Sequence, residues 1–330
     1  MVTVRRDELI ELCRDALLRV GADPGAAQVL AEATAEAELV GNRAVGVGHL
    51  FDYVDGYEQG RIGAGARPAI RRPAPAVIDV DARDGLAQTA FVDVLDELQK
   101  AARESGIAAL WIRNSFTCGE LGYYPRRLAE RGLLAVATSN SPALMSIGGA
   151  REPVLGTNPL AYGIPRPGKM PVVIDQASSS TAFVNIRRAA EAGDPIPPGW
   201  ALGPDGEQTQ DAAAALRGTL LPFGSHRGGN VALLVELLAT LSGASFSVDA
   251  APFDRGGTSP RIGVFLLAID PSNFAGSVER IAGQLASFRD DHQVRLPAVE
   301  LTSTADSVEI DPDLLRRLER AASDRGGRLV

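Results

Sequence analysis

The chain has 330 residues, of which 45% are hydrophobic and 22% are charged, and it carries a net charge of −8. These proportions are those of a folded globular protein with one large or two ordinary domains. Acidic and basic residues are interleaved along the chain, which argues against a nucleic acid or an anionic membrane surface as the main partner. The two cysteines and three histidines have no metal-ligand spacing, so neither a metal site nor a disulfide framework is expected.

The start of the chain, MVTVRRDELIELC, carries charges where a signal peptide needs an apolar stretch. No apolar run reaches the roughly 20 residues that a membrane-spanning helix requires. We therefore expect a soluble, cytoplasmic protein that binds neither a membrane nor nucleic acid.

Residues 4–41 predict two amphipathic helices, because their apolar residues recur at helical spacing. Asp23 and Pro24 are typical of an N-cap and a first helical position, so they predict the start of the second helix. A third helix is predicted over 48–59, and the Pro-, Gly- and Arg-rich residues 61–75 are predicted to form a connection.

From residue 76 onward, short β-rich runs alternate with helical stretches. The strands are predicted at 76–80, 107–114, 133–139, 171–175 and 261–269. The helices are predicted at 86–105, 119–131, 181–192, 229–243 and 276–289. Residues 193–211 are predicted to be loop, and a last helix after Asp311 and Pro312 is expected to pack on the N-terminal helices. No G-x-G-x-x-G opens a helix after a strand, so a Rossmann site is not supported.

Four segments place polar or ionisable groups at the ends of apolar strands, where ligands bind in open α/β architectures. In the first, a strand ends at Asn114, and Ser115, Thr117 and Gly119 lead toward a helix. Free N–H groups at such a helix start favour an anion, although a plain N-cap explains the pattern equally well. In the second, residues 156–159 return the chain to a strand through a turn that needs no ligand.

The third segment places Asp175 at the end of an apolar strand, where it either orients a catalytic group or caps the next helix. In the fourth, His226 and Arg227 precede two glycines and an apolar helix. Positive side chains are unfavourable at a helix start, so this pair suggests that an anion such as phosphate binds there. An exposed basic loop is the alternative.

Taken together and in this order, these segments resemble the malate/L-lactate dehydrogenase family, which lacks a Rossmann fold. The resemblance covers nearly the whole chain. The residues IDQAS at 174–178 and HRG at 226–228 are most similar to the Δ1-piperideine-2-carboxylate/pyrroline-2-carboxylate reductase branch. The most specific matches are RNS and GYY within 113–124, GTNPLAYGIP at 156–165, GDPIPPGWALGPDG at 193–206 and GTLLPFGSHRGGNVALLVELLA at 218–239.

The resemblance implies an α/β (α+β) fold with two domains. Residues 76–289 would form a non-Rossmann NAD(P)-binding and catalytic domain on a largely antiparallel sheet. Residues 1–75, completed by 290–330, would form a helical domain for substrate binding and dimerisation. It also implies a homodimer with the active site between domains, a small-molecule substrate, and NADPH, or alternatively NADH, as cofactor.

Matching positions imply roles for individual residues. We expect Thr117 and Asp175 to be catalytic together with His49, although His49 does not match the family pattern, and we expect Arg43, Tyr53 and Thr117 to contact the substrate. The implied cofactor contacts are Ser115, Asn140, Thr157, Asn158, Asp175, Gln176, Ala177, His226, Arg227 and Gly228.

The chain also departs from the family pattern, which carries a Ser-His pair, with the histidine as proton donor, followed by an arginine for the substrate carboxylate. Here the pair is Ala44 and Val45, and His49 stands at the arginine position. The histidine that often follows the Asn-Ser turn is Thr117. Near the C-terminus, the family's Pro-Gly-Glu-Arg is replaced by residues 297–300, Pro-Ala-Val-Glu.

These departures bear on the reaction. Reducing a ketone requires a proton as the hydride arrives, and a valine cannot supply it. A cyclic iminium already carries that proton, so the sequence favours reduction of a small cyclic 2-imino acid. A 2-hydroxy-acid/2-oxo-acid dehydrogenase using His49 or water as proton source is the alternative, and a cofactor-binding homologue without catalysis is a second one. A histidine titrates near neutral pH, so His49 is the substitute donor, although a structural role at a helix start is equally compatible.

Overall fold

The computed structural model describes residues 1–296 and 306–323. The predicted departure at residues 297–300 lies outside the described residues. Among the described residues, no helix has both the length and the apolar character needed to cross a bilayer.

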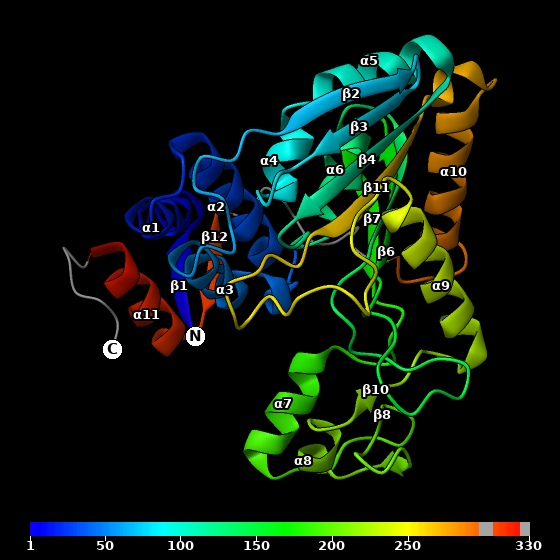
Figure 1. The fold of residues 1–330 in the computed structure, drawn as a ribbon. Helices are drawn as coiled ribbons and strands as arrows, with labels where there is room; N and C mark the ends of the chain where they lie inside the picture. Colours follow the sequence, from blue (N-terminus) through cyan, green and yellow to red (C-terminus); the bar gives the residue numbers. More distant parts are fainter. Residues whose placement is uncertain (297–305, 324–330) are drawn as a thin grey trace.

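A seven-stranded sheet with the strand order β2-β3-β4-β11-β5-β6-β7 forms the centre of the molecule (Figure 1). Only the β3–β4 pair is parallel, which confirms the expected largely antiparallel sheet. Its strands are β2 (Ala69–Ala74), β3 (Val77–Asp81), β4 (Ile107–Ser115), β5 (Leu134–Ser139), β6 (Leu160–Arg166), β7 (Lys169–Gln176) and β11 (Ile262–Ile269).

Helices cover both faces of this sheet. Side chains alternate between the two faces of a strand, and on β4 Leu110 joins a core cluster with α4 (Ala87–Val92), α5 (Leu95–Ser105) and α6 (Tyr123–Glu130). The neighbouring Trp111 packs against Phe265 and donates a 2.9 Å hydrogen bond to the Leu238 carbonyl of α9 (His226–Thr240). The helix α10 (Ser277–Asp290) packs against β6.

The N-terminal helices form a separate layer beside the sheet (Figure 1). This layer contains α1 (Arg6–Arg19), α2 (Pro24–Leu39), the short turn η1 (Arg43–Val45) and α3 (Val47–Glu58). β1 (Val2–Arg5) pairs with β12 (Ser307–Ile310), and α11 (Pro312–Ser323) packs on α1. The predicted docking of the last helix on the N-terminal helices is therefore confirmed. The Asp23 side chain accepts from the N–H groups of Gly25 and Ala26, as an N-cap should.

A small third unit lies below the sheet in the view of Figure 1. It combines α7 (Phe183–Ala192), α8 (Ala212–Ala215) and a three-stranded sheet around its own apolar cluster. The strands are β8 (Ala201–Leu202), β9 (Gln208–Thr209) and β10 (Thr219–Leu220).

Several local predictions were wrong. The predicted connection 61–75 contains β2, which forms because it pairs with β3, and the predicted loop 193–211 contains β8 and β9. The predicted helix 86–105 is two helices, because the backbone leaves the helical conformation at the buried Val94, with φ −119° and ψ 3°. The helix predicted from residue 119 begins at Tyr123.

Candidate functional site

The site lies at one end of the large sheet. β4, β5 and β7 run in the same direction, because β4 and β5 are both antiparallel to β11, and β5 and β7 are both antiparallel to β6. The carboxyl ends of these strands therefore lie at one end of the sheet, and α3 of the N-terminal layer is beside them (Figure 1). This arrangement brings His49 and Thr117 into contact, and it places Asp175 against Gly122, five residues after Thr117.

His49 is the histidine of this site. It lies in the first turn of α3, where its Nδ1 is 2.7 Å from Asp52 Oδ2 and its Nε2 is 3.3 Å from Thr117 Oγ1. The rings of Tyr53 and Phe253 pack edge-on against it, with centroids 5.0 and 5.8 Å away. The imidazole is thus held in place on both nitrogens, with one contact to a carboxylate and one to a hydroxyl.

Thr117 joins His49 to a buried hydroxyl. Its Oγ1 is 2.6 Å from the Tyr53 hydroxyl, which also receives a 3.1 Å hydrogen bond from Gln88 Nε2. Tyr53 and Gln88 are each 2% exposed, whereas Thr117 and His49 are half-buried. Burial holds the pKa of the Tyr53 hydroxyl well above its usual range, so this group stays uncharged.

Asp175 lies at the end of β7, where its Oδ2 accepts a 2.9 Å hydrogen bond from the Gly122 N–H. The alternative of a cap for the helix that follows is wrong, because α7 begins only at Phe183. Burial raises the pKa of Asp175 to about 6, with a further upward contribution from the Glu120 charge. The hydrogen bond from Gly122 and the positive charge of Arg126 act in the opposite direction. The carboxylate is therefore costly to charge, and a cation beside it would be stabilised.

A buried ionic cluster lies next to this carboxylate and was missed in the sequence. Arg126 donates to both oxygens of Glu120, at 2.5 and 3.1 Å, and lies 3.6 Å from Glu36 of α2. Arg127 reaches Glu36 as well, at 2.5 Å. These ion pairs tie α6 to the N-terminal layer. Their charges are scattered along the sequence, so no local motif predicts them.

Three predicted cofactor residues have buried side chains that bind the protein itself. Ser115 Oγ donates to the Ile262 carbonyl at 3.2 Å. Asn140 donates to the Ser245 carbonyl and accepts from the Gly263 N–H, both at 2.8 Å. Asn158 donates to the Ala232 carbonyl and to Glu236, and its own backbone carbonyl accepts from Ser178.

The other predicted cofactor residues lie at or near the surface. Gln176, His226 and Arg227 are exposed, and Thr157 and Ala177 are half-buried. Gly228 is buried, and a Cβ there would lie 2.2 Å from the Phe223 carbonyl oxygen, so the close approach requires glycine.

Backbone hydrogen bonds join the segments that carry these residues. Ser178 N–H donates to the Thr157 carbonyl at 2.8 Å, and Phe223 N–H donates to the Ser178 carbonyl at 3.0 Å. The structure thus brings the end of β7, the turn at 157 and the start of α9 together, as the resemblance implied. Arg43, in contrast, is exposed in η1, and its side chain has no hydrogen bond or ion pair with the described residues.

Two further side chains in the site were also missed. Asp52 follows His49 by three residues on a predicted helix, a spacing at which two side chains meet, so the sequence held a signal for it. Gln88 carries no such signal, because only the tertiary fold places it beside Tyr53.

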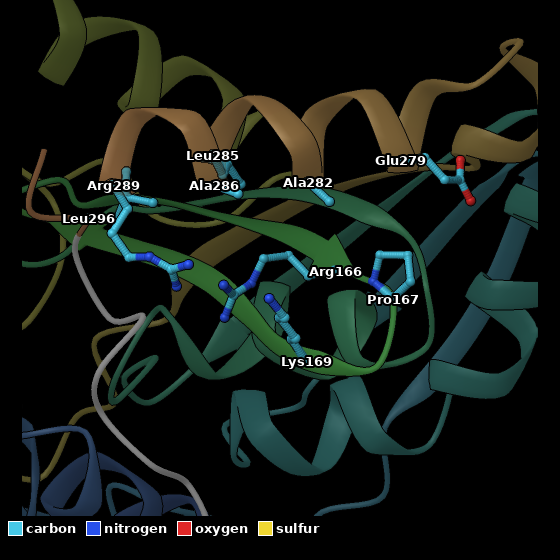
Figure 2. Close-up of a pocket in the computed structure, with 9 residues that line it drawn as sticks. All are labelled: Arg166, Pro167, Lys169, Glu279, Ala282, Leu285, Ala286, Arg289 and Leu296. Atoms are coloured by element: carbon cyan, nitrogen blue, oxygen red, sulfur yellow. The ribbon is translucent and has the colours of Figure 1, made fainter. Parts of the chain in front are cut away.

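A pocket of about 270 Å³ lies elsewhere, between α10 and the hairpin of β6 and β7 (Figure 2). Arg166, Lys169 and Arg289 extend into the space between the helix and the strands, and Leu285 and Ala286 form an apolar wall. Its position is near the turn of the hairpin, at the opposite end of β7 from Asp175. No predicted site residue lines it, so it is separate from the candidate site.

Comparison with known proteins matches residues 4–300 to the malate/L-lactate dehydrogenase family. The chain is 38% identical over 300 residues to a (2R)-3-sulfolactate dehydrogenase (NADP(+)) of Chromohalobacter salexigens, covering 90% of this chain and 89% of that protein. It is 37% identical over 293 residues to a Δ1-pyrroline-2-carboxylate reductase of Pseudomonas fluorescens, covering 87% of each.

Among solved structures, the chain resembles Δ1-piperideine-2-carboxylate reductase from Pseudomonas syringae pathovar tomato. The TM-score is 0.91 at 34% sequence identity, and the match covers 97% of this chain and all of that one. The resemblance seen in the sequence and the expected class of enzyme, an oxidoreductase, are confirmed. The chain belongs to the malate/L-lactate dehydrogenase family.

Proposed function

We propose that the chain is an NAD(P)H-dependent reductase of a small cyclic 2-imino acid. The relatives named as pyrroline-2-carboxylate and piperideine-2-carboxylate reductases support this reading. The observation that carries it is the proton-donor position of the family, which Val45 occupies here, while His49 lies 3.3 Å from the Thr117 hydroxyl.

The cofactor phosphates are assigned to the start of α9. The helix has 15 residues, and its first two, His226 and Arg227, are exposed and have no side-chain partner among the described residues. The positive charge of Arg227 at a helix start is unfavourable without an anion, and a phosphate would supply it. The exposed Arg227 guanidinium fits such a group, because it can donate two parallel hydrogen bonds to a phosphate. When bound, the reduced nicotinamide supplies a hydride.

The substrate is assigned to the space beside Thr117, His49 and Asp175. An iminium is a cation, so a carboxylate at the end of β7 favours it over the neutral imine. His49 holds a proton at Nε2 when it is charged, and it faces the Thr117 hydroxyl. This arrangement supports reduction of an imine, where protonation of the nitrogen is the only proton step needed before the hydride arrives.

A second candidate is a 2-hydroxy-acid/2-oxo-acid dehydrogenase. The relative named (2R)-3-sulfolactate dehydrogenase, at 38% identity, favours it. In that case His49 would have to deliver a proton to the carbonyl oxygen during hydride transfer.

The two candidates are separated by the oxidation of NADPH and NADH with a panel of substrates. The panel contains Δ1-pyrroline-2-carboxylate, Δ1-piperideine-2-carboxylate, pyruvate, oxaloacetate and the 2-oxo acid that corresponds to sulfolactate. We expect turnover of the cyclic imines. Turnover of the 2-oxo acids alone would support the second candidate. Binding of nicotinamide nucleotide in a calorimeter without turnover would support the homologue that has lost catalysis, and absence of binding would contradict all three.

We also propose that the protein is a homodimer and that it is located in the cytoplasm. Support for the dimer comes from four exposed leucines. Leu233, Leu234 and Leu237 of α9 are 44–57% exposed, and Leu241, directly after the helix, is 70% exposed. An apolar helix face of this kind is typical of a surface that another protein covers. The molar mass in solution, measured by light scattering, tests the dimer.

A further inference from the structure

Five side chains of the site form one continuous hydrogen-bonded path: Gln88, Tyr53, Thr117, His49 and Asp52. We propose that every hydrogen bond in this path donates in the same sense, from the Gln88 amide toward the Asp52 carboxylate, when His49 is neutral. Protonation of His49 then turns the Thr117 hydroxyl toward the substrate. Thr117 is then the group that donates the proton to the substrate, and Gln88 and Asp52 are positioning residues. The identity of the substrate rests on the proposed function, whereas the direction of the path does not.

The direction is set at one end by the backbone carbonyl of Cys118. Gln88 Nε2 lies 3.1 Å from this oxygen and also 3.1 Å from the Tyr53 hydroxyl. A carbonyl only accepts hydrogen bonds, and the opposite amide orientation would place two oxygens against each other. The amide nitrogen therefore donates to both neighbours, and the Tyr53 oxygen acts as an acceptor toward Gln88.

The Tyr53 proton must then go elsewhere. The hydroxyl is buried, and a buried O–H group almost always finds an acceptor. Among the described residues, the other partner of Tyr53 is the Thr117 hydroxyl, at 2.6 Å. Two hydroxyls can share a hydrogen bond in either sense, and the donation from Gln88 selects the sense in which Tyr53 donates to Thr117.

Asp52 sets the direction at the other end. Its carboxylate accepts from His49 Nδ1 at 2.7 Å, so the neutral imidazole carries its proton on Nδ1 and has a lone pair on Nε2. Thr117 donates to that lone pair while it accepts from Tyr53, which completes a path of uniform direction. A second proton, on Nε2, reverses only the hydrogen bond between Thr117 and His49. Thr117 then accepts from both His49 and Tyr53, and its own proton is free for a third partner.

Exposure identifies where that third partner binds. Tyr53 and Gln88 are buried, whereas Thr117 is half-buried, and Gly122, five residues further along the same segment, donates its N–H to the half-buried Asp175. A bound reduced nicotinamide would supply a hydride, with its two electrons, to the carbon of the C=N bond. The imine nitrogen takes the proton of Thr117, and Thr117 takes the Nε2 proton of His49. His49 ends neutral, with its remaining proton on Nδ1 and still donated to the Asp52 carboxylate. Atoms and charge balance without any further reactant.

The direction is tested by ¹⁵N NMR of the full-length protein labelled at histidine, without substrate. The chain has three histidines, at 49, 226 and 292, so His49→Gln assigns the relevant signals. We expect the neutral form of His49 to carry its proton on Nδ1. Asp52→Leu should move it to Nε2, which is the commoner form in water, while Glu58→Leu, an exposed position on the same helix, should not. An Nε2-protonated neutral His49 in the wild type would overturn the proposal.

The delivery of the proton is tested by turnover of the cyclic imine with NADPH. Thr117→Val should lower kcat by about 10²- to 10⁴-fold, the usual contribution of a positioned acid. Thr117→Ser should keep kcat within about tenfold of the wild type, because it keeps the hydroxyl. Gln88→Met should lower kcat without raising KM for NADPH. Equal losses in the valine and serine variants would overturn the role of Thr117. If the wild type reduces no imine, the proposed function fails, and the NMR result still decides the direction of the path.

Discussion

The residues predicted to contact the cofactor fall into two environments, although the same resemblance identified all of them. In the first environment the side chains are buried, and each makes hydrogen bonds with the protein. Ser115, Asn140 and Asn158 are each at most 1% exposed and bind backbone groups of distant segments. They hold the strand ends, the segment around Ser245 and α9 in position.

In the second environment the side chains are exposed and have no partner among the described residues. Gln176, His226 and Arg227 lie at the end of β7 and the start of α9. The difference shows that a family motif identifies the supports of a site as readily as the groups that touch its ligand. Substitutions in the first environment should cost stability, and those in the second should cost affinity.

The largest effect is expected for Glu236→Ala, which removes the carboxylate beneath Asn158. Glu236 is 3% exposed and accepts from Asn158 Nδ2 at 2.9 Å and from the N–H and Oγ of Ser247, both at 2.6 Å. Its removal leaves the N–H and the hydroxyl of Ser247 without their carboxylate acceptor, and it leaves Asn158 Nδ2 with the Ala232 carbonyl alone. We expect the free energy of unfolding to fall by about 3–5 kcal/mol, measured by urea denaturation.

Glu207→Ala is the matched control for that substitution. Glu207 is 75% exposed on its side chain and lies 3.8 Å from the equally exposed Arg151. Its loss should change the free energy of unfolding by less than about 0.5 kcal/mol. A cost at Glu236 as small as this would show that the buried cluster is not a structural support, and the distinction between the two environments would fail.

The next effect concerns Asp175, which lies between the two environments. Its folded-state pKa of about 6 is above the ordinary value of 3.8, so the folded protein holds this proton more tightly than the unfolded chain. The resulting stabilisation is fully present below about pH 4 and is lost as the pH rises through 6. Asp175→Asn stays neutral throughout. The stability of the wild type relative to this variant should therefore fall by about 3 kcal/mol between pH 4 and pH 7.

Urea denaturation of both proteins across this pH range provides the measurement. A constant difference between them would contradict the raised pKa of Asp175. It would also remove the argument that this carboxylate favours a cationic substrate.

Much of the fold was predictable because its signals are local. The N-cap at Asp23 and the apolar strand that ends at Asp175 were both confirmed. β2 was missed, because its residues Ala-Ile-Arg-Arg-Pro-Ala have no apolar alternation and become a strand only by pairing with β3. The break at Val94 was missed for a related reason, since packing in the core, not helix propensity, determines it.

The candidate site was predictable only in part. The sequence pointed to His49, Thr117 and Asp175 through the resemblance, and the structure places the first two within 3.3 Å of each other. The sequence could not show which of the predicted polar residues make internal hydrogen bonds and which remain available to a ligand. Asn158 and Arg227 look equally suited to a ligand in the sequence, and only tertiary contacts distinguish them.

The smallest effect, and the sharpest test of the second environment, is expected for Arg227→Ala. The side chain is exposed and makes no ion pair with the described residues, so the free energy of unfolding should change by less than about 0.5 kcal/mol. If the arginine binds a cofactor phosphate, loss of a charge-assisted hydrogen bond worth about 1.5–3 kcal/mol should raise KM for NADPH by roughly 10- to 100-fold. Arg188→Ala, an exposed arginine on α7, should leave KM unchanged. Equal KM values for NADPH in both variants would mean that Arg227 contributes nothing to cofactor binding. The start of α9 would then be an exposed basic surface and not the phosphate site.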